Sequence, residues 1–283
     1  MKIKIISLLL VISFLVACGS ESGSEQVSYN FKQGSSGLVL NFVENAPPEK
    51  VYPNSDFKII IKAENQAAYD LTNVKVNIIG LDPKYFGVYP LEQSFDTLAG
   101  KSLVNPSGDT KYLEFEVSSK ELFQNAEQYL GNYFLKVSYN SKVEFVDTIC
   151  INPNLYDVYD AGCKIESPKT YSGQGAPFGV GQMEELAYPG SDSRVEFRLL
   201  LQNFASGKVK KVVLNDAKLG GEEIECIFQG TDSKEMILDY QKQEIILFCK
   251  KKLRETNSYS TSLFLDLSYE YETKEQHSLL MMK

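Results

Sequence analysis

The chain has no tryptophan and only one histidine among its 283 residues. Nucleophilic catalysis by serine or cysteine normally needs a base within hydrogen-bond reach, most often a histidine. His277 lies in a polar stretch within the last seven residues, so a catalytic role is not expected. The usual zinc ligand sets cannot be assembled either, because there is no Cys-x-x-Cys and histidine is so scarce. We therefore predict a protein that is not an enzyme and that holds no metal or other cofactor.

Carboxylates are the remaining candidates for chemistry. Adjacent pairs such as Glu184–Glu185 and Glu222–Glu223 face opposite ways on a strand, so we expect solvated faces. Acidic residues in turns form an alternative, a calcium site, because hard cations take oxygen ligands from loops. These residues are Asp56, Asp192, Asp216 and Asp232. No loop has the spacing of an EF-hand.

The apolar run near the start of the chain, Ile5–Ala17, is shorter than the roughly 20 residues that span a bilayer as a helix. Lys2 and Lys4 precede this run, and together they have the form of a secretory signal. Leu15–Cys18 then fits the lipobox of exported lipoproteins, in which the cysteine receives a lipid and becomes the first residue. Plain cleavage after Gly19 is the competing interpretation. We predict lipid attachment at Cys18, and hence an extracytoplasmic, membrane-anchored protein on the cell surface.

Basic residues are outnumbered, with 29 Lys and Arg against 37 Asp and Glu and a formal net charge of −8. Phosphate binding is driven by clustered Lys and Arg that release counterions. This charge balance therefore argues against a nucleic-acid partner.

Four cysteines remain after Cys18, an even number in a chain predicted to leave the cytoplasm, which favours disulfides over free thiols. Three connectivities exist. The two close pairs fall in separate halves of the chain, which favours Cys150 with Cys163 and Cys226 with Cys249. The parity of Cys226 and Cys249 along their strands points both side chains to an apolar face, which predicts a bridge across the core of a second domain.

Apolar residues alternate with polar ones through most of the chain, as in Phe57, Ile59 and Ile61 of "FKIIIKAE". This period of two is typical of half-buried strands, and crossover helices are missing. The sequence predicts an all-β fold of two tandem immunoglobulin-like antiparallel β-sandwiches. The expected layout is a signal peptide at 1–17, a flexible tether at 18–36, a first sandwich at 37–165, a Gly/Ser/Pro-rich linker at 166–182 and a second sandwich at 183–283.

A short repeat supports two copies of one unit. "YPNSD" at Tyr52–Asp56 recurs as "YPGSD" at Tyr188–Asp192. An alternating strand follows each copy and ends in an asparagine, Asn65 or Asn203. Tandem duplication explains this shared pattern.

Aromatic residues are abundant, with 17 Tyr and 16 Phe. Most lie on predicted core faces, but several fall in segments that resemble loops, where they suit a recognition surface. These candidate binding residues are Tyr85, Phe86, Tyr89, Tyr156 and Tyr159. The alternative is that these loops fold over one end of a sandwich.

The stretch "GLVLNFVENAPPEKVYPNSDFKIIIKAEN" at Gly37–Asn65, with "DTICINPN" at Asp147–Asn154 and "GQGAP" at Gly173–Pro177, resembles archaeal exported surface lipoproteins. Their tandem immunoglobulin-like domains are similar to the CARDB-type adhesion module. The resemblance covers most of the chain and implies an extracytoplasmic sandwich protein. It transfers no catalytic residues.

The function expected from the sequence is binding, adhesion or envelope organisation by a lipid-anchored surface protein. Its partners would be the membrane, through the lipid on Cys18, and a surface or envelope protein or glycan. The alternative is a subunit of a surface filament or secretion assembly joined by β-strand addition, with Val27–Gln33 as donor strand.

Overall fold

Alternation between buried and exposed side chains runs through the strands of the computed structural model. In β3 (Asp56–Asn65), Ile59, Ile61 and Ala63 are buried, and the residues between them are partly exposed. The structure describes residues 30–153, 162–190, 192–239, 244–254 and 257–283, and Phe31–Lys283 forms one compact unit. All secondary structure in the described residues is β, which confirms the predicted all-β antiparallel fold. No helix among them is long and apolar enough to cross a membrane.

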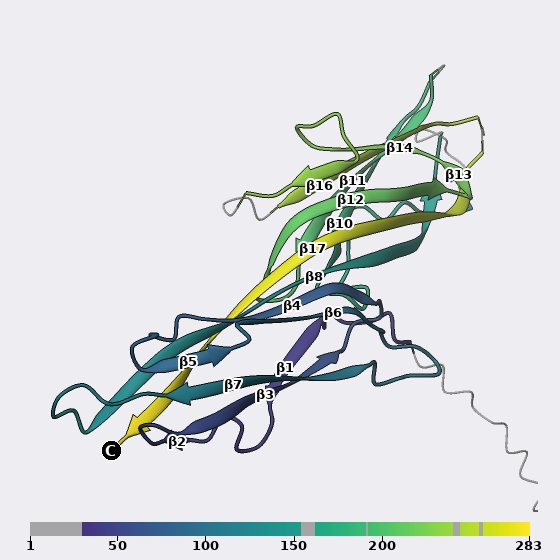
Figure 1. Cartoon of the computed structure of the whole chain (residues 1–283). Helices are drawn as coiled ribbons and strands as arrows, with labels where there is room; N and C mark the ends of the chain where they lie inside the picture. Colours follow the sequence, from purple (N-terminus) through teal and green to yellow (C-terminus); the bar gives the residue numbers. More distant parts are fainter. Residues whose placement is uncertain (1–29, 154–161, 191, 240–243, 255–256) are drawn as a thin grey trace, which may run out of the picture. The chain divides into compact units, whose positions relative to one another are not determined.

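Three sheets make up the fold (Figure 1). The first has the order β1-β3-β7-β5, with β1 (Leu38–Phe42), β7 (Thr110–Ser119) and β5 (Phe86–Tyr89). The second has the order β14-β16-β11-β10-β9, with β14 (Glu225–Phe228), β16 (Ile245–Lys252), β11 (Arg194–Asn203), β10 (Phe178–Tyr188) and β9 (Lys169–Thr170).

The third sheet has eight strands, six of them in the order β13-β12-β17-β8-β4-β6. They are β13 (Glu222–Glu223), β12 (Lys208–Leu219), β17 (Tyr259–Met282), β8 (Gln128–Ile151), β4 (Leu71–Ile79) and β6 (Glu92–Leu98). The other two, β15 (Glu235–Ile237) and β2 (Lys50–Val51), pair with β12 and β17 respectively.

The two longest strands, β8 and β17, have 24 residues each and pair along their whole length. The register runs from Gln128 opposite Met282 to Ile151 opposite Tyr259. Neither strand contains a proline, which would remove a ladder hydrogen bond from a central strand. Because the two strands are this long and pair without interruption, they continue through both halves of the fold.

Each half is a sandwich. In the first half, Phe42 of β1 packs edge-on against His277 of β17, with ring centroids 4.8 Å apart. In the second, Phe178 of β10 packs against Tyr269 of β17 at 5.4 Å. Three strands, β1-β3-β7, thus face β4-β8-β17 in one sandwich, and β10-β11-β16 face β12-β17-β8 in the other. Both are immunoglobulin-like cores, and each takes one strand from the other half of the chain.

The first strand of each sandwich behaves differently. In the first half, β1 pairs with β3, and the chain then changes sheets, so that β2 pairs in parallel with β17. Pro47 and Pro48 lie between these strands, and proline cannot extend a ladder. The corresponding β10 contains no proline, since Pro189 follows its last residue, and it pairs with β11 along its length.

The predicted linker at 166–182 differs from the structure. Residues 175–181 are buried, and β9 and the start of β10 fall inside this segment. The backbone of Ala68 donates to the carbonyl of Gly175 at 2.7 Å. A Gly/Ser/Pro-rich composition indicates turns, but here the turns pack against the first sandwich instead of separating two domains.

The end of the predicted tether at 18–36 is also packed. Lys32 Nζ lies 2.7 Å from a carboxylate oxygen of Glu144, and Gly175 donates its N–H to the Gly34 carbonyl at 2.8 Å. Residues 18–29 lie outside the described part of the chain. The first strand begins at Leu38, one residue after the predicted start of ordered structure at Gly37.

Both predicted disulfides are present, with Cα atoms 5.7 Å apart in Cys150–Cys163 and 4.0 Å apart in Cys226–Cys249. The predicted bridge across the second core is wrong in its placement. Cys226 and Cys249 are register partners on β14 and β16, so this disulfide joins neighbouring strands of one sheet. Parity along a strand gives the face of a side chain, but it does not tell which strand lies beside it.

Candidate functional site

Loops at one end of the first sandwich are joined by hydrogen bonds. Ser119 Oγ, at the end of β7, donates to the carbonyl of Tyr52. Lys120 Nζ donates to the Pro83 carbonyl at 2.7 Å, and the backbone of Lys283 donates to Glu127 at 3.0 Å. We call this set, residues 52–55, 80–85, 120–127 and 283, the distal loops. They lie at the Asp56 end of β3. The chain enters the sandwich at the other end of this strand, where Leu38 of β1 pairs with Asn65.

Large apolar side chains are exposed at the distal loops. Tyr52 is 61% exposed, and Phe123 is 70% exposed. Leu130, near the start of β8, is 55% exposed. Exposed aromatic residues on loops held by a rigid scaffold are typical of recognition surfaces.

The predicted binding residues Tyr85, Phe86 and Tyr89 are only partly where a recognition loop would place them. Phe86 begins β5 and is buried in the core. Tyr85 stacks on Tyr129 with ring centroids 3.8 Å apart. Tyr89, at the end of β5, is exposed. For Phe86 and Tyr85 the alternative, a segment folded over the end of the sandwich, describes the structure.

Three predicted site residues, Cys18, Tyr156 and Tyr159, lie outside the described residues. The first residues of the predicted donor strand, 27–29, lie outside them as well. Within the described part of that segment, Lys32 forms the ion pair with Glu144. Lipid attachment at Cys18, binding by Tyr156 and Tyr159 and the donor strand therefore stay predictions.

The predicted acidic turn residues do not come together. Asp192 Oδ1 lies 2.9 Å from Lys252 Nζ, and Asp216 is bonded to Lys218. In the described part of the chain, no three His, Cys, Asp or Glu side chains are grouped in a way that could hold a metal ion. His277 packs between Phe42 and Tyr133 in the first core.

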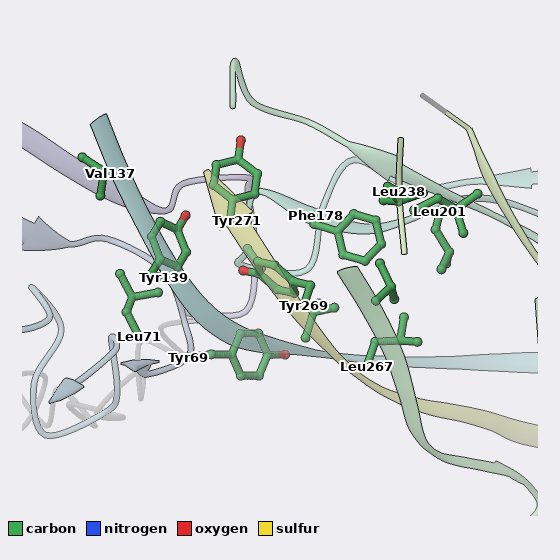
Figure 2. Close-up of a cluster of buried hydrophobic side chains, with 14 of the residues drawn as sticks. Tyr69, Leu71, Val137, Tyr139, Phe178, Leu201, Leu238, Leu267, Tyr269 and Tyr271 are labelled. Carbon is green, nitrogen blue, oxygen red and sulfur yellow. The ribbon is translucent and has the colours of Figure 1, made fainter. Parts of the chain in front are cut away.

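A cleft of about 570 Å³ lies where the middle of β8 and β17 meets the corner before β4. Tyr69, Ser141 and Tyr269 are among its lining residues. The Tyr69 hydroxyl donates to the Glu144 carbonyl and accepts from the Glu144 N–H. Figure 2 shows Tyr69 and Tyr269 together with Tyr139 and Tyr271 in this part of the core. Burial raises the pKa of Tyr69 to about 12, so it stays protonated at neutral pH.

Glu144, whose backbone contacts the Tyr69 hydroxyl, is the centre of an ion-pair network. Hydrogen bonds from Lys142 and then Lys32 lower the pKa of its carboxyl. The Lys142 and Lys32 ammonium groups lie 2.8 and 2.7 Å from the two Glu144 oxygens. The Lys32–Glu144 ion pair thus joins the segment before β1 to β8.

One buried carboxyl was not expected from the sequence. Glu185 on β10 is 7% exposed, and its Oε1 has no hydrogen-bond partner among the described residues. Burial raises the pKa of this carboxyl to about 7. The adjacent pair Glu184–Glu185 was predicted to be solvated, but Glu185 shares the inward parity of Met183, and this parity is the signal that could have identified it.

The fold and its covalent links define a class: an all-β protein of two antiparallel sandwiches with two disulfides. Disulfides are typical of proteins that fold outside the reducing cytoplasm. The extracytoplasmic location expected from the sequence agrees with them.

Comparisons with known proteins add no family. No family model matches the chain, and no curated protein matches it. Among solved structures, it is similar to the secreted serine protease VesC from Vibrio cholerae at 15% identity and a TM-score of 0.22, over 82% of this chain and 50% of that one. The chain thus spans half the length of VesC.

A second solved structure is the CupB6 tip adhesin from Pseudomonas aeruginosa, at 8% identity and a TM-score of 0.19. That match covers 88% of this chain and 99% of the adhesin. At these TM-scores neither likeness carries an argument about function.

Proposed function

We propose that this protein is a non-enzymatic, lipid-anchored surface protein that binds a partner protein through the distal loops of its first sandwich. The lipid would be attached at Cys18, in keeping with the resemblance to archaeal envelope lipoproteins. The observation that carries the binding role is the exposure of Tyr52 and Phe123 on loops joined to one another by hydrogen bonds.

The position of these loops supports the proposal. The chain enters the first sandwich at β1, where Leu38 pairs with Asn65, and the distal loops lie at the other end of the same strands. An anchor upstream of β1 would therefore leave the distal loops accessible. Exposed aromatic side chains supply large contact areas and dominate the energy of many protein interfaces.

Chemical crosslinking on intact cells tests the binding role. The anchored protein would be crosslinked and recovered, and its partners identified by mass spectrometry. Replacing Tyr52 and Phe123 by serine should remove the crosslinked partner while leaving the amount of surface protein unchanged.

The chain offers a matched control for this experiment. Leu103 and Val104 are 75% and 95% exposed, in the loop between β6 and β7 near the opposite end of the sandwich. Replacing these two residues by serine removes a similar apolar area and should leave crosslinking intact. Equal loss of the partner in both double variants would contradict a role for the distal loops.

Anchoring is tested separately. Mass analysis of the mature N-terminus should find Cys18 as the first residue with attached lipid, and Cys18→Ser should release the protein from membranes. An unmodified chain that starts at Ser20 would contradict the anchor without affecting the binding proposal.

A further inference from the structure

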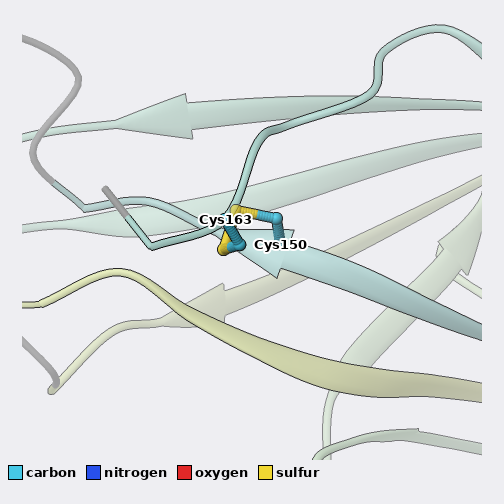
Figure 3. The surroundings of a disulfide bond; sticks show 2 residues. All are labelled: Cys150 and Cys163. Carbon is cyan, nitrogen blue, oxygen red and sulfur yellow. A yellow bond between two sulfur atoms is a disulfide. The ribbon is translucent and has the colours of Figure 1, made fainter. Parts of the chain in front are cut away.

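The two disulfides lie in different environments. Cys226 and Cys249 are both buried between neighbouring strands. Figure 3 shows Cys150 at the end of β8, joined to Cys163. Cys150 is buried, but Cys163 is partly exposed. A thiolate from solution can attack only a sulfur that it can reach, so we take Cys163, the more exposed residue of the pair, as the point of attack.

A cavity of about 200 Å³ borders the Cys150–Cys163 disulfide. Glu185 lines the same cavity, and its Oε1 is buried without a hydrogen-bond partner among the described residues. The other charged groups that line it are Lys164, Glu166 and Lys169. Lys169 is paired with Asp147 at 2.7 Å, and Lys164 and Glu166 are exposed.

The buried position of Cys150 creates a chemical requirement. Attack on Cys163 expels the Cys150 sulfur as a thiolate, and a buried charge without a partner is costly. A proton donor within the cavity lowers that cost, because the negative charge passes to the donor, which then takes up a proton from the solvent. Glu185 fits the role, because burial raises the pKa of its carboxyl to about 7 and a large fraction is therefore protonated at neutral pH.

We propose that Cys150–Cys163 is an exchangeable disulfide and that Glu185 is the proton donor to the Cys150 sulfur during its reduction by an external dithiol. A thiolate of the dithiol attacks Cys163 Sγ and forms a mixed disulfide. The bond between the two cysteine sulfurs breaks, and its electron pair moves to Cys150 Sγ, which takes the proton of Glu185.

The second thiol of the dithiol completes the reaction. As a thiolate, it attacks the dithiol's own sulfur in the mixed disulfide and releases Cys163 as a thiolate. The dithiol is thereby oxidised to a disulfide, and the protein's cystine is reduced by two electrons. The positive charge of Lys164, next in the chain to Cys163, stabilises the departing thiolate.

The test uses the full-length protein in mild detergent, with dithiothreitol as the dithiol probe. Free thiols would be alkylated at intervals and located by peptide mass spectrometry. Without denaturant, Cys150 and Cys163 should become alkylated while Cys226 and Cys249 stay protected. Protection of the second pair also reports that the protein remains folded.

The observed rate of reduction is divided by the concentration of dithiothreitol thiolate, which removes the pH dependence of the attacking group. The pH dependence that remains reports the proton donor. This normalised rate should fall as the pH rises from 6 to 8 in the natural protein. Glu185→Gln should be slower at pH 6 by about tenfold or more and should lose the pH dependence. Glu166→Gln, in the same cavity wall, is the matched control and should behave like the natural protein.

Three results would overturn the proposal: reduction of both disulfides at one rate, no reduction without denaturant, or an unchanged pH profile in Glu185→Gln. If Glu185→Gln loses protection of the Cys226 pair, Glu185→Asp replaces it as the test variant. That variant keeps a carboxyl and should retain the pH dependence, and a flat profile in it would also overturn the proposal.

Discussion

Tyr139 and Tyr271 are register partners near the midpoint of the β8–β17 ladder, with ring centroids 5.4 Å apart. This pair marks the point where both long strands pass from one sandwich to the other. The Tyr271 hydroxyl donates to Asn203 Oδ1 at 3.1 Å and accepts from the Gly207 N–H at 2.9 Å. Tyr271 thus connects the shared ladder to the corner between β11 and β12.

Replacing Tyr271 by phenylalanine should lower the free energy of unfolding by about 1–2 kcal/mol, because the Gly207 N–H loses its acceptor. Urea denaturation followed by circular dichroism measures this change. Tyr112→Phe is the control, since Tyr112 is exposed on β7. Equal midpoints and slopes for the two variants would show that the Tyr271 hydroxyl adds no stability.

The two repeated asparagines have the same local role in different surroundings. Asn65 Oδ1 accepts from Ala67 N, and its Nδ2 donates to the Tyr69 carbonyl. Asn203 repeats both bonds, with Ala205 N and the Gly207 carbonyl. This shared pattern agrees with the duplication predicted from the sequence.

Burial should separate the effects of removing these asparagines. Asn65 is fully buried and also donates to the Leu98 carbonyl at 2.8 Å, whereas Asn203 is exposed. We expect Asn65→Ala to cost about 3 kcal/mol and Asn203→Ala about 1 kcal/mol, because only buried groups lose their partners without gaining water. Chemical denaturation of both variants measures the difference. Similar costs would contradict this account.

The shared strands predict that the first sandwich does not fold alone. A fragment of residues 31–165 lacks the part of β17 that pairs with the first half of β8. It should show no cooperative thermal transition and no dispersed amide spectrum. If that fragment folds, two independent tandem domains are the better description.

A chimera gives the complementary test. Asn140 and Glu270 are register partners, so residues 31–140 can be joined to 270–283 by a short Asn-Gly turn. This chimera restores the missing strand and should fold cooperatively. Failure of both the fragment and the chimera would indicate that the first sandwich also requires packing against the second.

Glu185 makes stability depend on pH. Its pKa in the folded protein is about 7, above the ordinary value of 4.5, because burial disfavours the charged form. Below pH 4.5 the carboxyl is protonated in both states. As the pH rises from 4.5 to 7, Glu185 ionises in the unfolded chain but stays largely protonated in the folded protein. The free energy of unfolding therefore falls by about 3 kcal/mol and then levels off.

Glu185→Gln should remove this loss, so the variant should match the natural protein near pH 4 and exceed its stability at pH 8. Thermal or urea unfolding at several pH values measures the difference between the two. Glu184→Gln is the control, because Glu184 is partly exposed and paired with Arg198. A constant difference across pH would rule out the buried carboxyl as its source.

Several features were predictable because they depend on local chemistry. The alternation in "FKIIIKAE" assigned Ile59 and Ile61 to the core, and both are fully buried. The spacing of the cysteines gave both pairings. Glu185 was misjudged because a charged side chain was given more weight than the parity it shares with Met183.

The amino-acid sequence by itself determined the all-β class, the inward face of most strands and the disulfide pairs. These follow from side-chain period and from the number and spacing of the cysteines, whereas export and lipid attachment at Cys18 stay a prediction. Only the tertiary structure decided that β8 and β17 belong to both sandwiches and that the Gly-rich segment at 166–182 is packed. A period of two is the same whether a strand crosses one sandwich or two, and the choice of partner strand depends on contacts far apart in the chain.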